Sequence, residues 1–186
     1  MVAGVDEAGR GPLAGPVVAA AVVLPVDTLV EGADDSKQLS RDVREALFED
    51  IIRAATFVGV GAASVREIDR RNILRATTVA MQRALDHLSE APGHIVVDGL
   101  PVKWLGRDHD AVVDGDALIH CVGCASIVAK VIRDRLMERL SRRYPGYGWE
   151  RNSGYGTQEH RTAIDDLGLT PHHRLTFTGL QYELSL

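Results

Sequence analysis

The chain has 186 residues, of which 45% are hydrophobic and 25% charged, the composition of an ordinary globular protein. No apolar run is long enough to cross a membrane, and the first residues lack the basic and then apolar pattern of a secretory signal, so we expect a cytoplasmic protein without a membrane partner. The net charge of −5 does not suggest a nucleic-acid binder, but Lys and Arg cluster between residues 130 and 143 and can form a local basic patch. The length suits one domain over residues 1–186.

The first predicted element is an apolar strand, Val2–Val5, which stops at two carboxylates, Asp6 and Glu7. A loop follows in which two glycines flank one cation: Gly9, Arg10 and Gly11. Acidic side chains at the exit of a buried strand can hold a hard divalent cation, and glycines let the backbone approach an anionic ligand closely. Because neighbouring strand residues point to opposite faces, Asp6 and Glu7 can share an ion only if the strand ends here or Glu7 uses its backbone oxygen. The alternative is a solvated acidic turn.

Strands and helices alternate in the next part of the chain. We predict a strand over 17–24 paired antiparallel with the first, a helix from the N-cap Ser40 to about 54, a strand over 57–64, and a helix from Ser64 to about 92 with a break near Asn72. The helical spacing predicts buried faces that carry Val43, Leu47, Ile51 and Ile52 in the first helix, and Ile68, Ile73, Leu74, Val79, Met81, Leu85 and Leu88 in the second.

A fourth strand, beginning at His94, ends at Asp98. Sites gather beyond the carboxyl ends of parallel strands, so Asp98 can lie beside Asp6 if the two strands are neighbours. An Asp-Gly turn is the common alternative. After a short strand over 110–113 we predict one long helix from about Gly115 to Arg143, in which Asp116 can act either as a site residue or as a cap.

The second half of the long helix is basic, and its charges form either a solvated face or a surface that follows phosphates. Residues from about 145 to 186 are expected to form a C-terminal helical extension, with a helix over 158–167 capped by Thr157. Tyr155 stands between two glycines, where its ring is exposed and can stack on a sugar or base. Cys121 and Cys124 are interpreted as small core residues rather than a redox or metal pair, because no second pair accompanies them.

Four carboxylates each stand at the end of a predicted strand or the start of a predicted helix: Asp6, Glu7, Asp98 and Asp116. Carboxylates that converge repel one another and take up protons unless cations compensate them. Two divalent ions about 3.5–4 Å apart suit phosphodiester hydrolysis. Oxygen ligands favour Mg²⁺ or Mn²⁺ over Zn²⁺.

Eight motifs occur in one order between residue 2 and about residue 177: Asp6–Pro16, Asp35–Lys37, Asn72–Thr77, Val97–Gly99, Gly115–Asp116, Ala125–Lys130 with Arg133–Asp134, Gly154–Thr157 and His173–Arg174. Together they resemble ribonuclease HII, the type 2 ribonuclease H family, in its bacterial branch. The resemblance implies an α/β ribonuclease H-like fold, a mixed sheet flanked by helices with a C-terminal helical segment. It also implies metal-dependent hydrolysis of RNA in RNA/DNA hybrids, and nicking of duplex DNA 5′ to single embedded ribonucleotides, which leaves a 3′-hydroxyl and a 5′-phosphate and serves ribonucleotide removal.

The resemblance also implies roles for the residues that match its motifs. The four carboxylates Asp6, Glu7, Asp98 and Asp116 would be the catalytic ligands of two Mn²⁺ or Mg²⁺ ions. Three loop residues, Gly9, Arg10 and Gly11, would contact the ribose 2′-hydroxyl through their backbone. This hydroxyl is the group that distinguishes RNA from DNA. Tyr155 would pack on the adjoining deoxyribose. Three cations are candidates for phosphate contacts, with structural pairing as the equal alternative: Lys37, Lys130 and Arg133.

The chain departs from the family pattern at Asp114, at the Cys121/Cys124 pair and at Ser153, which bears on metal preference and substrate affinity more than on the reaction. Two other functions stay open, a non-catalytic nucleic-acid-binding module and a different two-metal nuclease such as a junction resolvase. The four carboxylates favour an enzyme over the first, and the Gly-Arg-Gly loop with Tyr155 argues against the second. A monomer is the default expectation, and no protein partner is inferred.

Overall fold

A mixed sheet of five strands forms the centre of the computed structural model, which describes residues 1–33 and 39–177. The strands are β1 Val2–Ala8, β2 Val17–Val23, β3 Phe57–Ala63, β4 His94–Asp98 and β5 Asp110–Val112. Their order in the sheet is β3-β2-β1-β4-β5. β1 pairs antiparallel with β2 and parallel with β4, so the predicted antiparallel first pair is confirmed and the strands that end near Asp6 and Asp98 are neighbours.

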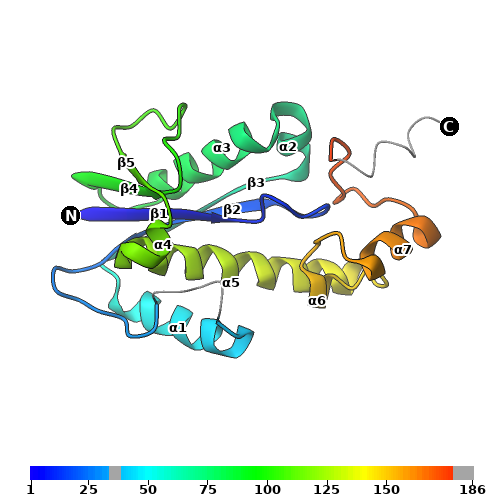
Figure 1. Cartoon of the computed structure of the whole chain (residues 1–186), viewed down its shortest axis with the longest axis horizontal. Helices are drawn as coiled ribbons and strands as arrows, with labels where there is room; N and C mark the ends of the chain where they lie inside the picture. Colours follow the sequence, from blue (N-terminus) through cyan, green and yellow to red (C-terminus); the bar gives the residue numbers. More distant parts are fainter. Residues whose placement is uncertain (34–38, 178–186) are drawn as a thin grey trace.

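Helices cover both faces of this sheet (Figure 1). One face carries α2 Val65–Arg71 and α3 Ile73–Asp86, and the other carries α1 Arg41–Ala54 and α5 His120–Arg143. The short α4 Gly115–Leu118 precedes α5, and α6 Trp149–Asn152 and α7 Gln158–Leu167 lie at the far end of α5, beyond the carboxyl end of β1. No helix in the described ranges is both long and apolar enough to cross a bilayer.

Small residues allow the helices to approach the sheet closely. A Cβ on Gly61 of β3 would lie 2.1 Å from the carbonyl oxygen of Ala80 in α3. A Cβ on Gly4 of β1 would lie 2.3 Å from the carbonyl carbon of Cys121 in α5. Real Cβ atoms do not approach backbone this closely, so glycine at both positions sets the distance between the sheet and its helix layers.

Alternation along the strands decides which site residue faces which helix layer. Ala3 and Val5 of β1, like Ile95 and Val97 of β4, belong to the core shared with α3. The register pairs Val5 with Val97, so the next residues along the two strands, Asp6 and Asp98, come to the opposite face, toward α4 and α5. Glu7 returns to the α3 side. The fold therefore separates two sequence neighbours and brings together two carboxylates that are 92 positions apart in the chain.

The predicted helix caps are confirmed. The Ser40 hydroxyl accepts from the Val43 N–H at 3.3 Å, and Ser64 and Glu67 form both halves of a capping box. Thr157 caps α7 by accepting from the His160 N–H at 3.2 Å. The predicted break near Asn72 is also present, since Asn72 has φ 68° and separates α2 from α3.

Two predicted helix faces are wrong in part. In α1 the buried side carries Leu47, Phe48 and Ile51, whereas Val43 and Ile52 are 45% and 43% exposed. The helix is turned so that the larger Phe48 ring is removed from water, which buries more apolar surface than Val43 would. In α3 the buried side is formed by Ala76, Ala80, Met81, Ala84 and Leu85 among others, and Leu74 is 55% exposed.

Three predicted boundaries are also wrong. The first strand does not stop before Asp6 but runs to Ala8, because β2 continues to pair with it. The second helix ends at Asp86 rather than near 92, since the chain must turn so that β4 can pair beside β1, and Leu88 is buried outside the helix. The long helix is interrupted by Ile119, whose extended backbone separates α4 from α5 and lets the first turn of α5 pack on β1 at Gly4.

Candidate active site

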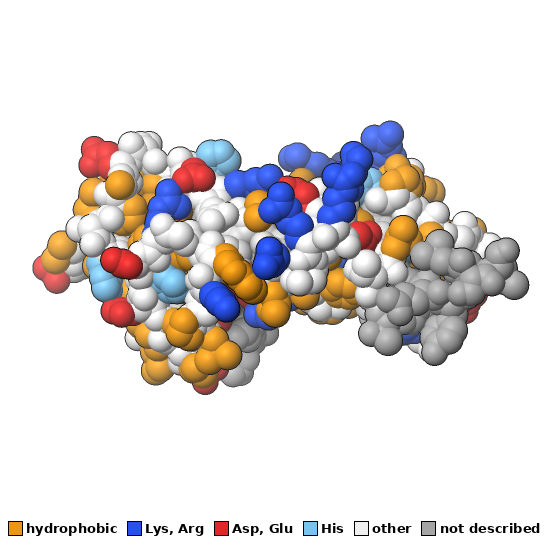
Figure 2. Space-filling model, turned by 90° about the horizontal axis from the view of Figure 1, so that it is seen from above, with side chains coloured by type: hydrophobic (Ala, Val, Ile, Leu, Met, Phe, Trp, Pro, Cys, Tyr) orange, Lys and Arg blue, Asp and Glu red, His pale blue; other side chains and the backbone are white. Residues whose placement is uncertain are grey.

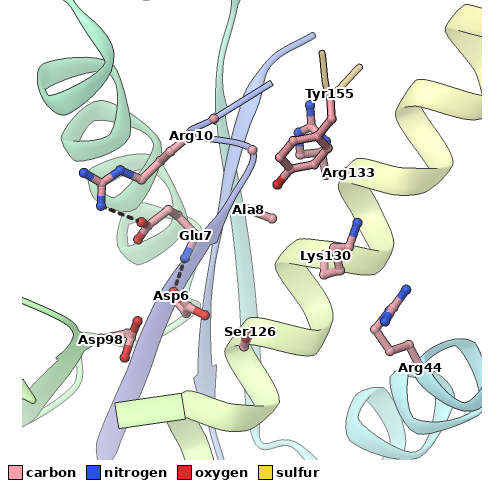
Figure 3. A pocket seen from close by; sticks show the side chains of 12 residues that line it. Asp6, Glu7, Ala8, Arg10, Arg44, Asp98, Ser126, Lys130, Arg133 and Tyr155 are labelled. Carbon is pink, nitrogen blue, oxygen red and sulfur yellow. Dashed lines mark hydrogen bonds and ion pairs between the residues drawn. The ribbon is translucent and has the colours of Figure 1, made fainter. Parts of the chain in front are cut away.

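A cavity of about 500 Å³ opens where β1, β4 and α5 meet. Its wall contains nine of the residues predicted from the sequence: Asp6, Glu7, Gly9, Arg10, Gly11, Asp98, Lys130, Arg133 and Tyr155. It also contains Arg44 and Ser126, to which no role was assigned from the sequence, and Figure 3 shows both on the α1 and α5 side. Lys37 lies outside the described residues. We call this space the catalytic cavity.

Asp6 and Glu7 occupy opposite sides of β1 (Figure 3). Both belong to the strand, where they pair with Ala20 and Ala19 of β2. Glu7 Oε1 lies 3.2 Å from Nη1 of Arg10, while the Asp6 carboxylate turns toward Ser126 of α5. The condition set from the sequence, that the two side chains share an ion only if the strand ends between them, is therefore not met. Sharing through the Glu7 backbone oxygen is the arrangement that alternation permits.

The Asp6 carboxylate is buried among other carboxylates. It is 5% exposed, and its Oδ1 accepts from the Glu7 N–H at 2.6 Å. Burial, followed by the negative charges of Glu7 and Asp98, raises the pKa of Asp6 well above its ordinary value, against the opposing hydrogen bond from Ser126. A divalent cation in the cavity would offset this repulsion and favour the ionised carboxylate, so the electrostatics of this side chain fit a metal site.

Asp116 does not line the cavity, but its backbone contacts Asp98 from α4. Its backbone N–H donates to Asp98 Oδ1 at 3.3 Å, and its side chain is 5% exposed. The N-cap position of α4 is held by Asp114, with φ 56°, so the alternative that Asp116 caps the helix is wrong. Gly115 lies against Asp98, since a Cβ there would be in ordinary contact with Asp98 Oδ1 at 3.4 Å.

The carboxylates fit a divalent ion by their chemistry and do not form a closed set of ligands. Over residues 1–33 and 39–177, no three His, Cys, Asp or Glu side chains are drawn together closely enough to hold an ion. The donors around the cavity are carboxylate oxygens, which are the ligands that hard cations such as Mg²⁺ and Mn²⁺ prefer. Ions of this class usually keep several waters, so they do not require a dedicated cage of protein atoms.

The glycine-rich loop is held from beneath by Arg174, a side chain with no solvent exposure. Its guanidinium donates to the carbonyl oxygens of Gly9, Arg10 and Gly15 at 2.6, 2.9 and 2.9 Å, and to Pro16 at 3.3 Å. Burial, and then the charge of Arg133, lower the pKa of Arg174 to about 9. In a planar trans peptide the N–H points opposite to the preceding C=O, so these bonds turn the N–H groups of Arg10 and Gly11 away from Arg174.

Arg133 supports the loop from the α5 side and is 1% exposed. It donates to the carbonyl oxygens of Pro16, Ser153 and Ala14 at 3.0, 2.9 and 3.2 Å. Gly9 has φ 96°, and a Cβ there would lie 2.0 Å from Arg133 Nε, so only glycine fits beside this guanidinium. The sequence left phosphate contact and structural pairing open for Arg133, and these hydrogen bonds are structural pairing. Lys130 lines the cavity and also pairs with Asp134 at 2.7 Å.

Tyr155 stands on the rim of the cavity opposite the carboxylates (Figure 3). It is 45% exposed, and a Cβ on Gly11 would lie 3.6 Å from its Cε1 atom, so its ring borders the glycine-rich loop. Gly154 has φ 82°, and a Cβ there would lie 2.5 Å from the Ala14 carbonyl oxygen. That carbonyl is part of the loop, so the loop and Tyr155 are packed as one unit.

A buried pair of histidines fixes the backbone of Tyr155. His160 Nδ1 bonds the Tyr155 carbonyl oxygen at 2.9 Å, which makes Nδ1 the donor. His160 Nε2 then accepts from Trp149 Nε1 at 3.0 Å and from His173 Nε2 at 3.1 Å. His173 Nδ1 in turn accepts from the Thr170 N–H at 2.9 Å. Every ring nitrogen has a partner with both rings neutral, and burial, followed by the neighbouring His160, lowers the pKa of His173 to about 4.

The two cysteines are free thiols. Cys124 is fully buried in the core between the sheet and α5, as predicted, and Cys121 is half-buried. Burial raises the pKa of Cys121, which disfavours the reactive thiolate.

Comparison with known proteins shows the family of the chain. The family model described as ribonuclease HII matches residues 3–180. The ribonuclease HII of Ruegeria pomeroyi is 54% identical over 177 residues, which cover 95% of this chain and 75% of that protein, and the one of Thermosynechococcus vestitus is 55% identical over 179 residues, covering 95% and 83%. The crystal structure of the ribonuclease H2 of Pyrococcus horikoshii superposes with a TM-score of 0.82 at 31% identity, covering 97% of this chain and 95% of that one. The chain therefore belongs to the ribonuclease HII family.

Proposed function

We propose that this protein is an endoribonuclease that cleaves the RNA strand of RNA/DNA hybrids and nicks duplex DNA on the 5′ side of a single embedded ribonucleotide. As a member of the ribonuclease HII family it is a nuclease that hydrolyses phosphodiester bonds. The observation that carries the finer proposal is that one cavity brings carboxylates together with a glycine-rich loop whose N–H groups are oriented by a buried arginine. The first group suits phosphodiester hydrolysis, and the second suits recognition of a sugar hydroxyl.

The carboxylates are proposed to hold two divalent ions, Mg²⁺ or Mn²⁺: Asp6, Glu7, Asp98 and Asp116. When bound, such ions activate the attacking water and stabilise the departing oxygen. The raised pKa of Asp6 supports this role, because burial, and then the charges of Glu7 and Asp98, disfavour the ionised carboxylate, and a bound cation would offset this. The contribution of Glu7 is proposed to come from its backbone oxygen, since its side chain lies on the other side of β1.

The loop is proposed to read the ribose. The N–H groups of Arg10 and Gly11 face away from Arg174, and an N–H can donate to the 2′-hydroxyl oxygen, which deoxyribose lacks. Gly11 leaves room for a sugar to approach the backbone, since a Cβ there would meet only Tyr155 Cε1, at 3.6 Å. Tyr155 borders Gly11 and is exposed, so the next sugar along the strand, a deoxyribose at an RNA–DNA junction, can pack on its ring.

Local charge supports a phosphate-bearing substrate despite the net charge of −5. Figure 2 shows Lys and Arg side chains gathered across the middle of one face of the molecule. Besides the buried Arg133, the cations that line the catalytic cavity are Arg10, Arg44 and Lys130, and the first of these has a half-exposed side chain. Lys130, and Lys37 on the resemblance alone, are proposed to contact phosphates; Arg133 is proposed to support the loop. Such contacts predict binding that weakens steeply with salt.

The proposal is tested by cleavage of a labelled DNA duplex that carries one ribonucleotide, beside an all-DNA duplex of the same sequence, each with Mg²⁺, with Mn²⁺ and with a chelator. We expect a metal-dependent nick 5′ to the ribonucleotide and no cut in the all-DNA duplex. Cutting of both duplexes would indicate a nuclease that does not read the sugar. Binding without any cutting would indicate a binding module.

A further inference from the structure

A second cavity of about 450 Å³ adjoins the catalytic cavity on the α3 side of β1. The two share three wall residues, Glu7, Arg10 and Asp98, so a strand that passes the carboxylates can continue into it. The rest of its wall comes from α3 and from the segment that follows β4, and includes Leu74, Thr77, Met81, Leu100, Val102 and Trp104. We call it the Trp104 cavity.

Trp104 is an exposed aromatic side chain on an anchored backbone. Its side chain is 43% exposed, although the next residue, Leu105, is 1% exposed in the core beneath α3. Gln82 Nε2 of α3 donates to the carbonyl oxygens of Trp104 and Leu105 at 2.9 and 3.2 Å. The Leu105 N–H donates to Val102 at 3.0 Å. A large ring held in water by fixed backbone is already ordered for a ligand, so little conformational entropy is lost on binding.

The ring lies among cations and apolar side chains. The Arg75 guanidinium carbon lies over the Trp104 ring, 4.5 Å from its centroid, and Lys103 Nζ lies over it at 5.7 Å. A base or sugar can therefore stack only on the ring surface that these cations leave open. Leu74 and Leu100 beside it are 55% and 76% exposed. An exposed aromatic ring with cations stacked against it is a combination with which proteins bind nucleotides, whose bases and sugars have an apolar face and whose phosphates are negative.

Thr77 adds a buried hydroxyl to the wall of this cavity. Its side chain is 6% exposed and lines the Trp104 cavity, and its hydroxyl is the one buried side-chain N or O atom in the described ranges that has no hydrogen-bond partner. The next residue shows the usual arrangement, since the Thr78 hydroxyl donates to the Leu74 carbonyl oxygen at 3.1 Å. A buried hydroxyl without a partner is unfavourable, and rotation of the Thr77 side chain toward the cavity that it lines would let a bound polar group satisfy it.

We propose that the Trp104 cavity binds a nucleotide of the substrate next to the one at the carboxylates, with its base or sugar on the Trp104 ring. Arg75 and Lys103 face the neighbouring phosphate, and the Thr77 hydroxyl bonds a polar edge of the same nucleotide. The wall shared with the catalytic cavity favours a nucleic-acid strand over a free small molecule or a protein segment, because a strand held at the carboxylates is delivered here. The inference rests on the proposed function.

Tryptophan fluorescence tests this directly, because the chain has two tryptophans and the other, Trp149, is fully buried beside His160. The probe is a short DNA duplex with one ribonucleotide, bound with Ca²⁺ in place of Mg²⁺, with affinity measured in parallel by anisotropy of a labelled duplex. We expect the duplex to quench the fluorescence of the wild type. Trp104→Phe should bind with similar affinity and show no such quenching, because a phenyl ring can still stack.

Two further variants measure the contribution of each group. Trp104→Ala should bind the duplex roughly 5- to 10-fold more weakly, the lower end of the range for loss of one aromatic–base stack. Thr77→Val should bind roughly 2- to 10-fold more weakly while its thermal midpoint stays equal to or above that of the wild type, since it removes a hydroxyl that the free protein leaves without a partner. Val26→Ala is the control, because Val26 is 90% exposed and lines neither cavity.

Two truncated duplexes show on which side of the ribonucleotide the bound nucleotide lies. One ends next to the ribonucleotide on its 5′ side, and the other ends next to it on its 3′ side. The Trp104→Ala defect should vanish with one of them and persist with the other. Quenching that persists in Trp104→Phe, or wild-type affinity in Trp104→Ala, would overturn the inference while cleavage by the wild type leaves the proposed function standing. A wild-type protein that neither binds nor cleaves the duplex would overturn the proposed function, and the inference with it.

Discussion

Replacement of Arg174 by lysine tests whether the glycine-rich loop is held in place from below. Arg174 serves four carbonyl oxygens of the loop, those of Gly9, Arg10, Gly15 and Pro16. Lysine keeps the positive charge but carries its three protons on one nitrogen, so it cannot serve carbonyls that are spread along the planar fork of a guanidinium. The Pro16 carbonyl keeps its bond from Arg133, so we expect two of the other three carbonyls, those of Gly9, Arg10 and Gly15, to lose their partner in Arg174→Lys.

The structure sets the size of this effect. Each buried carbonyl left without a partner costs about 1–3 kcal/mol, so Arg174→Lys should lower the free energy of unfolding by about 2–6 kcal/mol. For a chain of this length the thermal midpoint should fall by about 10 °C. The N–H groups of Arg10 and Gly11 also lose their fixed direction, and loss of one donor to the 2′-hydroxyl, worth about 1 kcal/mol, lowers kcat/KM at an embedded ribonucleotide roughly fivefold.

The assay compares thermal unfolding and kcat/KM on two substrates, a duplex with one ribonucleotide and a continuous RNA/DNA hybrid. Arg142→Lys is the matched control, because that side chain is 76% exposed and pairs with Glu138 on the surface. We expect the control to resemble the wild type. If Arg174→Lys were as stable as the control and cleaved the duplex with one ribonucleotide at the same kcat/KM, the proposed support of the loop by Arg174 would be refuted.

Three other predictions concern the same end of the molecule. Tyr155→Ala should reduce cleavage at a single ribonucleotide more than cleavage of continuous RNA, while Tyr155→Phe keeps the ring and the preference; equal losses on both substrates would exclude a junction-reading role. Gly9→Ala should destabilise the fold by at least about 2 kcal/mol in chemical unfolding, from positive φ and the contact with Arg133, and Gly11→Ala, with a Cβ 3.6 Å from Tyr155, should be much milder. His173 has a pKa of about 4 when folded and 6.5 as its ordinary value, so its contribution to stability is complete above pH 6.5 and is lost as the pH falls toward 4, by up to about 3 kcal/mol. In pH-dependent unfolding, His173→Asn should reduce this slope relative to the wild type. His160 and His172, whose pKa values burial also lowers, keep their share of the slope, and the raised pKa of Asp6 acts with the opposite sign. An unchanged slope would refute the assignment.

Local patterns in the sequence were sufficient for the elements and for most of the cavity wall. The strand that ends at Asp98 and the caps at Ser40, Ser64 and Thr157 follow from side-chain periodicity and capping chemistry, which depend on neighbours in the chain. The adjacency of Asp6 and Asp98 was conditional on parallel neighbouring strands, and that condition is met.

The support behind the site could not be predicted in the same way. Arg174 lies 165 positions from Gly9, and nothing in its local sequence distinguishes a buried guanidinium from an exposed one. The same holds for the link from His160 to His173, which depends on how the C-terminal segment packs. Leu74 was assigned to the core because its spacing fits a helical apolar face, whereas it borders the Trp104 cavity, where exposure of apolar surface serves a proposed ligand.

The most direct test of the account measures cleavage and binding of one ribonucleotide-containing duplex by Asp98→Asn. The amide keeps the shape of the side chain and an oxygen that can accept from the Asp116 N–H, but it removes one charge from the cavity. With Asp108→Asn as an exposed control, we predict that Asp98→Asn folds and binds the duplex like the wild type and shows no metal-dependent nick. Cleavage at the wild-type rate, or loss of folding together with binding, would contradict the claim that these carboxylates perform the hydrolysis.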